Sequence, residues 1–159
     1  NLDQIVGIPN HRFLTQHGDA LEKDLLKNGK SACFLSLKIK NLPEIYSSFG
    51  VKHGDLFQRG IASTISSTLP SPKYIFKFSE TIYIVILVGQ ELSEVQPFKI
   101  KLEKVLNSAP LFVEGKPMQV CAELGVACFP DNGKTISQLI EASLYETTSK
   151  LFHKTTMTL

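Results

Sequence analysis

Lys77-Phe78-Ser79-Glu80-Thr81-Ile82-Tyr83 lies between two apolar runs, residues 74–76 and 84–88. Two β-rich runs around a short polar break predict a hairpin. The second run is apolar at every position, so we expect a central strand that is covered on both faces. The tip, residues 79–81, would be held rigidly by a buried strand, but Ser, Glu and Thr are a poor set of catalytic groups.

The composition is that of a soluble globular domain, with 43% hydrophobic and 20% charged residues. A chain of 159 residues suits one core, so we expect a single domain over residues 1–159. The formal charge of +2 gives no electrostatic reason to expect binding to nucleic acid or to a membrane surface. Because the first residue is Asn1 rather than Met, we expect the domain to belong to a longer protein.

Cysteine and histidine residues are scattered rather than grouped into a site. Cys33, Cys121 and Cys128 are odd in number, have no CxxC spacing and lie in apolar runs. This pattern predicts buried free thiols in a reducing compartment. We therefore expect a cytoplasmic domain, whether or not the full-length protein is anchored in a membrane. The four histidines show no ligand spacing, and we expect surface or structural roles for them.

Hydrophobic periodicity predicts an alternation of helices and strands along the chain. Helices are expected over residues 11–26, 42–50, 53–69, 94–107 and 136–153. Strands are expected over 32–40, in the hairpin 73–88, and in a second hairpin of residues 111–113 and 118–129. Hairpin connections imply a largely antiparallel sheet, and the helices must cover its faces. The predicted class is α/β (α+β).

Three segments carry a family resemblance. Residues 3–12 read DQIVGIPNHR, residues 49–55 read FGVKHGD, and residues 124–133 read LGVACFPDNG. They resemble, in order, D-x-L-T-G-L-P-N-R-R, F-G-H-x-x-G-D and I-G-V-A-x-F-P-x-D-G of GGDEF domains. These are the diguanylate cyclase domains of bacterial cyclic di-GMP signalling. The resemblance implies a central, mostly antiparallel five-stranded sheet wrapped by helices, similar to nucleotidyl cyclase domains.

The same alignment places the central hairpin tip on the family signature, R-x-G-G-D/E-E-F. Its core becomes the sequence Ser79, Glu80, Thr81, Ile82 and Tyr83. The aromatic residue at the last position is kept, and Lys77 stands in the Arg position. We identify the chain as a degenerate member of the family.

The degenerate positions include those that hold metal in the family. Family members use carboxylates to hold two divalent metals while the 3′-oxygen of one GTP attacks the α-phosphate of another. The family's D-x-D-x-F-K becomes KIKNLP here, so Lys38 and Lys40 replace both Asp residues, and Thr81 replaces the signature acid. Ser79 and Glu80 add side chains where glycines would let phosphate approach the backbone. We expect no catalytic residues, no metal and no cofactor.

Residual contacts to a nucleotide remain open. Lys38 and Lys40 either hold an anion directly or are solvated or paired lysines. Tyr46 replaces the family's guanine-contacting Asn, whereas Asp55 is retained, either to contact the base or to cap a helix. The phosphate-binding Lys of the last helix falls on Leu151 without gaps, and a one-residue slip would place it on Lys150. The product-inhibition motif R-x-x-D is missing from residues 69–73.

These observations favour a catalytically inactive regulatory module of cyclic di-GMP signalling. It would act as a scaffold, a dimerisation surface (as a homodimer) or an allosteric input for a fused sensor or EAL domain. The alternative is a GTP-sensing domain that binds nucleotide without cyclising it, through Asp55, Lys38 and Lys150, and regulates a neighbouring phosphodiesterase or receptor domain.

Overall fold

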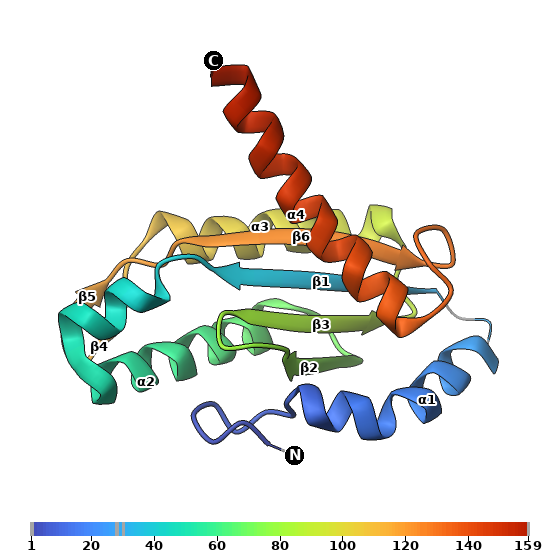
Figure 1. The fold of residues 1–159 in the computed structure, drawn as a ribbon, viewed down its shortest axis with the longest axis horizontal. Coiled ribbons are helices and arrows are strands. Elements are labelled where there is room, and N and C mark those ends of the chain that lie inside the picture. The colour runs from blue at the N-terminus through green and yellow to red at the C-terminus, as the bar shows by residue number, and fades with distance from the viewer. Residues whose placement is uncertain (1, 28, 30, 159) are drawn as a thin grey trace.

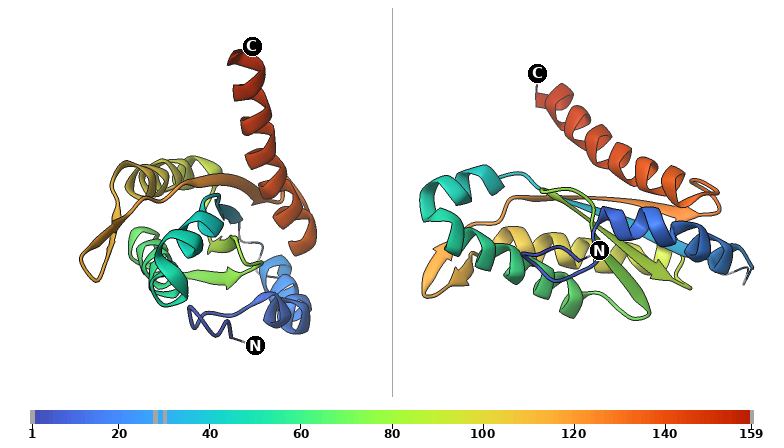
Figure 2. Two further views of the ribbon diagram at one scale, coloured as in Figure 1. Left: turned by 60° about the vertical axis from the view of Figure 1, so that its left-hand side comes forward. Right: turned by 60° about the horizontal axis from the view of Figure 1, so that its bottom comes forward.

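The computed structural model describes the backbone of residues 2–27, 29 and 31–158 and the side chains of residues 2–25, 29 and 31–147. These residues form a main sheet of four antiparallel strands in the order β2-β3-β1-β6 (Figure 1). The strands are β1 (Ala32–Ile39), β2 (Lys73–Lys77), β3 (Ile82–Val88) and β6 (Ala122–Phe129). Helices α1 (His11–Lys27) and α4 (Ile136–Thr158) cover one face of the sheet (Figure 2). Helices α2 (Leu42–Thr68) and α3 (Leu92–Ser108) cover the other face.

Alternation along the central strands divides the core into two layers. Cys33, Leu35 and Leu37 of β1 face α2 and α3, while Phe34 faces α1 and α4. In β3, residues 83–87 are all buried, because β3 lies between β1 and β2 and both of its faces are covered. The prediction of a central, doubly covered strand is confirmed.

The prediction of a five-stranded sheet is wrong. The segment predicted as one strand over residues 118–129 is broken at residues 119–121, which leaves β5 (Lys116–Met118) paired only with β4 (Leu111–Val113). The break is caused by a residue distant in the sequence. The Asn41 side chain donates to Gln119 O (2.8 Å) and accepts from Cys121 N (3.1 Å), so it takes bonds that a continuous strand would make.

Helix α2 is kinked where the sequence predicted one helix to end and the next to follow. Gly50 has non-helical dihedral angles (φ 86°, ψ 174°), and the helix resumes directly after it. The predicted end of a helix at Gly50 is therefore confirmed, as a kink that divides α2 into two helical segments. None of the helices in the described part of the chain is long and apolar enough to cross a bilayer.

The prediction of free, buried thiols is wrong for all three cysteines. Cys33 and Cys128 form a disulfide, and Cys121 is an exposed free thiol. The pairing follows from the sheet register, because Cys33 of β1 lies directly opposite Cys128 of β6 and both side chains point to the same face.

Both edges of the main sheet have partners outside it. On β6, the Asn107 side chain bonds Ala122 N and Ala122 O (2.8 and 3.0 Å), Glu146 accepts from Val126 N, and Asn132 Oδ1 accepts from Cys128 N (2.8 Å). On β2, the opening turn covers the edge: Lys77 N donates to Pro9 O (2.7 Å). Asn10 also accepts from Phe13 N (3.2 Å), as expected of the residue that starts α1.

Two glycines lend themselves to a matched stability test. A Cβ at Gly125 of β6 would collide with Ser143 O and the Thr147 hydroxyl of α4, so we expect Gly125→Ala to lower the free energy of unfolding by about 1–3 kcal/mol. A Cβ at Gly18 of α1 would meet no atom within 4 Å, so Gly18→Ala should raise it by about 0.5–1 kcal/mol through helix propensity. Urea unfolding measures both changes, and equal effects of the two substitutions would contradict the packing of α4 on β6.

Candidate functional site

The hairpin tip lies at the end of β1 and forms one wall of a cavity. The tip is closed by Phe78 N and Ser79 N, which both donate to Ile82 O (2.9 and 3.2 Å), and Ile39 N of β1 donates to Thr81 O (2.8 Å). The cavity has a volume of about 820 Å³, within the range of small-molecule sites. It lies between the opening turn, α2 and the tip, and it is lined by Asp3, Ile5, Asn10, His11, Arg12, Leu42, Pro43, Tyr46, Val51, Asp55, Gln58, Lys77, Phe78, Ser79, Glu80 and Thr81.

The two positions at which the family resemblance implies metal ligands lie on neighbouring segments, the end of β1 and the hairpin tip, but only one of them lines the cavity. Thr81 lines the cavity, but Lys38 is exposed beside Ile82 and is not among the lining residues. Lys40, two residues further on, forms an ion pair with Glu123 (2.9 Å). This pairing is the second of the two alternatives for Lys40, in which it is a paired lysine rather than an anion ligand.

Three carboxylates reach the cavity, and two of them already have hydrogen-bond partners. Asp3 Oδ1 accepts from the backbone N–H groups of Ile5 and Val6 (2.9 and 3.0 Å), and Asp55 accepts from Tyr46. Glu80 is exposed at the tip. The described residues contain no group of three or more His, Cys, Asp or Glu side chains that could hold a metal ion.

A polar network crosses the floor of the cavity. The Lys77 ammonium donates to Gln58 Oε1, and the Gln58 amide donates in turn to the Tyr46 hydroxyl (2.7 Å). The Tyr46 hydroxyl donates to Asp55 Oδ1 (2.6 Å), and the Tyr83 hydroxyl donates to Gln58 Oε1 (3.3 Å). The links satisfy buried polar atoms of Lys77, Gln58 and Tyr83 and join them to the half-buried Tyr46 and Asp55.

Lys77 is the charged end of this network and is only 4% exposed. Its ammonium group lies 5.0 Å from the centre of the Tyr83 ring, which is an arrangement that favours the cation. Burial lowers the pKa of Lys77, while the carboxylates of Asp3, Glu80 and Asp55 act in the opposite direction. The Arg position of the family signature thus holds a buried lysine that an amide oxygen and an aromatic ring stabilise.

The two tyrosines of the network are held in their neutral form. Burial raises the pKa of Tyr46 to about 12, and the hydrogen bond to Asp55 acts in the same direction. Burial likewise raises the pKa of Tyr83. Tyr83, at the last position of the signature, is fully buried, and its aromatic ring packs in the core.

The Tyr46 ring, on the segment of α2 before the kink, packs against the segment after the kink because residue 54 is glycine. A Cβ at Gly54 would lie 2.5 Å from two carbons of the Tyr46 ring, so any larger residue would displace the ring. The ring therefore occupies space beside Asp55, the position at which the family resemblance implies a contact to the base. The prediction of Asp55 as a helix N-cap is wrong, because Asp55 lies inside α2, after the kink at Gly50.

The structure brings together only part of the predicted set of nucleotide contacts. Asp55 lines the cavity, Lys38 does not, and the Lys150 side chain lies outside the described residues. Sequence reasoning missed Gln58, which joins Lys77 to Tyr46. The signal was its place on the inward stripe of α2, since a polar residue between Phe57 and Ile61 is buried and needs a hydrogen-bond partner.

Removal of the Tyr46 hydroxyl should affect stability in a pH-dependent way. At neutral pH, Tyr46→Phe removes the hydrogen bonds that the hydroxyl makes with Asp55 and with the buried Gln58 amide, and it should lower the free energy of unfolding by about 1–3 kcal/mol. A raised folded-state pKa stabilises the fold at pH values below 10, and this contribution is lost as the pH rises towards 12. The free energy of unfolding, measured with urea from pH 8 to 11, should therefore fall less steeply with rising pH for Tyr46→Phe than for the parent. The same pH dependence in both proteins would contradict the raised pKa of Tyr46 and its hydrogen bond to Asp55.

Comparison with known proteins agrees with this architecture. The fold is similar to that of the GGDEF domain of TpbB (YfiN) from Pseudomonas aeruginosa, with a TM-score of 0.82 and 17% identity, over 94% of this chain and 90% of that one. It is also similar to a sensory box/GGDEF family protein from Caulobacter crescentus, with a TM-score of 0.79 and 21% identity over 93% and 96%. The FimX GGDEF domain of P. aeruginosa is similar as well, with a TM-score of 0.81 and 15% identity, over 93% of this chain and 91% of that one.

Sequence comparison gives the same family. A curated relative, the bifunctional diguanylate cyclase/cyclic di-GMP phosphodiesterase MucR of P. aeruginosa, is 18% identical over 90% of this chain. The chain spans 21% of the length of that relative. A sequence model of the family described as "Diguanylate cyclase, GGDEF domain" matches residues 1–148. The chain therefore belongs to the GGDEF domain family.

Proposed function

We propose that this GGDEF domain is catalytically silent and serves as a regulatory module in cyclic di-GMP signalling. The observation that carries the proposal is the network of Lys77, Gln58, Tyr46 and Asp55, which occupies the floor of the cavity at the signature hairpin. The network uses protein groups to satisfy one another at positions where a cyclase would present groups to GTP.

Loss of the metal ligands supports this proposal. Two-metal phosphoryl transfer needs anionic oxygen ligands to fix the ions and to neutralise charge on the phosphates. Thr81 offers a neutral hydroxyl, and Lys38 offers a cation that would repel a divalent metal. The nearest acid of the tip, Glu80, is exposed to solvent.

The base subsite is altered as well. A tyrosine at position 46 exchanges a small amide for a ring that packs on Gly54 and donates its hydroxyl hydrogen to Asp55. A guanine base at that place would need the ring to move and the hydrogen bond to Asp55 to break. Both changes oppose nucleotide binding independently of the metal.

The scaffold around the altered cleft is intact, which favours a role that depends on folding rather than on chemistry. The hairpin strands, the doubly covered β3 and the buried Tyr83 all support the sheet. The relative MucR is named as both a cyclase and a phosphodiesterase. We therefore propose that this domain regulates a fused partner, such as an EAL phosphodiesterase or a sensor domain. It would do so as a scaffold or as a dimerisation surface.

A second candidate is a GTP sensor that binds nucleotide without turning it over. The cavity of about 820 Å³, with Asp55 on its wall, favours this candidate. In that case Tyr46 must swing away from Asp55, and Lys38 and Lys150 would supply the positive charge near the phosphates.

The enzymatic part of the proposal is tested by assay for product. The purified chain, incubated with GTP and Mg²⁺ or Mn²⁺, should form no cyclic di-GMP detectable by chromatography. A second protein restores the family residues at the tip and on β1 through the substitutions Lys38→Asp, Ser79→Gly, Glu80→Gly and Thr81→Glu. Its rate of cyclic di-GMP synthesis measures how far these positions alone account for the lack of activity. Synthesis of cyclic di-GMP by the unmodified chain would refute the proposal.

Calorimetric titration with GTP and with cyclic di-GMP, with and without Mg²⁺, separates the scaffold from the sensor. We expect no heat from the parent chain, and measurable GTP binding by Tyr46→Asn if the ring is the main obstacle. Tyr145→Asn is the matched control, because Tyr145 is 73% exposed on α4 and away from the cavity. GTP binding by the parent that is lost in Lys38→Ala would favour the sensor.

A further inference from the structure

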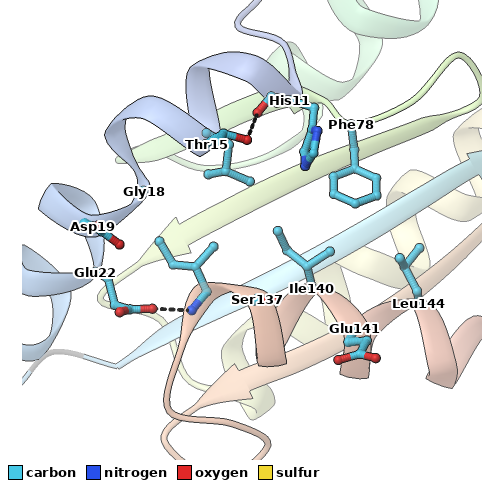
Figure 3. Close-up of a pocket in the computed structure, with 12 residues that line it drawn as sticks. His11, Thr15, Gly18, Asp19, Glu22, Phe78, Ser137, Ile140, Glu141 and Leu144 are labelled. Carbon is cyan, nitrogen blue, oxygen red and sulfur yellow. Dashed lines mark hydrogen bonds between the residues drawn. The ribbon is translucent and has the colours of Figure 1, made fainter.

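A second cavity lies on the other side of the molecule from α2 and α3, between α1 and α4 (Figure 3). Its volume is about 380 Å³. Residues from the two helices and from the hairpin tip line it: His11, Leu14, Thr15, Gly18, Asp19, Glu22, Phe78, Ile136, Ser137, Ile140, Glu141 and Leu144. We call this feature the α1–α4 groove.

The lining residues form two facing stripes. On α1 they recur from His11 through Gly18 to Glu22, and on α4 from Ile136 through Ile140 to Leu144. At a rise of about 1.5 Å per residue, the stripes are about 16 and 12 Å long, which is two to three turns of helix. A groove with two helices as walls is the shape into which a third helix packs.

The two ends of the α1–α4 groove are fixed by different contacts. At one end Glu22 Oε1 accepts from Ile136 N (2.7 Å), which joins α1 to the start of α4. At the other end His11 packs edge-on against Phe78 (centroids 4.9 Å apart), and Leu144 completes the wall (Figure 3). The groove is thus held open as part of the fold.

Gly18 is an unusual choice for the wall of this groove. It lies in the interior of α1, where glycine costs about 0.5–1 kcal/mol relative to alanine. No atom lies within 4 Å of a Cβ built on it, so neighbouring parts of this chain do not require a glycine. A side chain at this position would instead project into the groove, so the glycine keeps the groove open.

Charge restricts the occupant. Leu14, Ile136 and Ile140, which are largely buried, form the apolar base of the groove, while Asp19, Glu22 and Glu141 place carboxylates along its walls. No lysine or arginine is among the residues that line it. An apolar surface bordered by negative charge is complementary to a helix that carries leucine-like side chains on one face and lysine or arginine beside them.

We propose that the α1–α4 groove is a docking site for a basic amphipathic helix of a partner protein. The helix would lie between α1 and α4, with its apolar face on Leu14, Ile140 and Leu144. Its basic side chains would reach Asp19 and Glu141. The groove shares His11 and Phe78 with the signature cavity, but none of the residues on which the helix would lie, so the inference stands whether or not that cavity binds GTP.

A synthetic helical peptide provides the probe. It is about 18 residues long, with Leu at positions i, i+3, i+4 and i+7 of each repeat and Lys elsewhere. In ¹⁵N-labelled protein, we expect saturable amide shift changes that centre on Leu14, Gly18, Ile140 and Leu144. The same peptide with Glu in place of Lys should not bind.

Two variants test the groove itself. Gly18→Leu fills it, and Asp19→Lys/Glu141→Lys reverses its charge; each should weaken peptide binding about tenfold or more. Gly18→Leu should unfold at no lower temperature than the parent, so lost binding would not reflect lost folding. Glu44→Lys/Glu103→Lys, which makes the same change of charge on α2 and α3, should bind as the parent does.

Several results would overturn the proposal. They are the lack of saturable shifts, shifts that map to another surface, equal binding of the Glu peptide, or binding that neither groove variant weakens. Shifts of the groove residues that depend on protein concentration without any peptide would assign the groove to a second copy of this chain and also exclude the proposal.

Discussion

The structure depends on β1, the strand that pairs antiparallel with a neighbour on each side. Its partners are β3 over residues 32–38 and β6 over residues 32–39. Since alternate side chains point to opposite faces, a slip of one residue would exchange the side chains of the two core layers and disrupt the packing of both. The same register sets Cys33 against Cys128 and brings the end of β1 against Thr81 of the hairpin tip. Core, disulfide and cleft are therefore consequences of one pairing.

The cleft at the tip shows that the sheet can keep its structure while the side chains that line the cleft change. A lysine ammonium with 4% exposure is costly unless the protein replaces the water it has lost. Here the replacement is Gln58, whose amide relays the interaction to Tyr46 and on to Asp55. Removal of one member leaves its neighbours without partners, so the members are coupled. That coupling makes the return of a small residue at position 46 a change to the whole network.

Local sequence patterns were sufficient for most of the architecture. The hairpin of β2 and β3, the helices on both faces and the kink at Gly50 follow from periodicity and backbone preference. The errors arose where distant segments decide the outcome. Asn41 interrupts the strand at residues 119–121, and the disulfide joins positions 95 residues apart. Neither contact has a local signature in a single sequence.

The candidate site was likewise predicted only in part. Alignment to the family motifs placed Tyr46 and Asp55 in one cleft, as the structure does, because both lie on α2. It also grouped Lys38 with them, although that side chain lies outside the cavity. Gln58 could be found only by asking which polar residue of a buried helix stripe needs a partner. Patterns thus locate a site more readily than they reveal which of its groups bond to one another.

The side chains along β6 have a consequence for the behaviour of the protein at high concentration. A sheet edge with unpaired N–H and C=O groups can recruit strands from other molecules and lead to aggregation. Asn107, Glu146 and Asn132 occupy such groups on β6, and the opening turn meets β2 at the other edge. Growth of the sheet from one molecule to the next is therefore disfavoured along β6 and at the Lys77 end of β2.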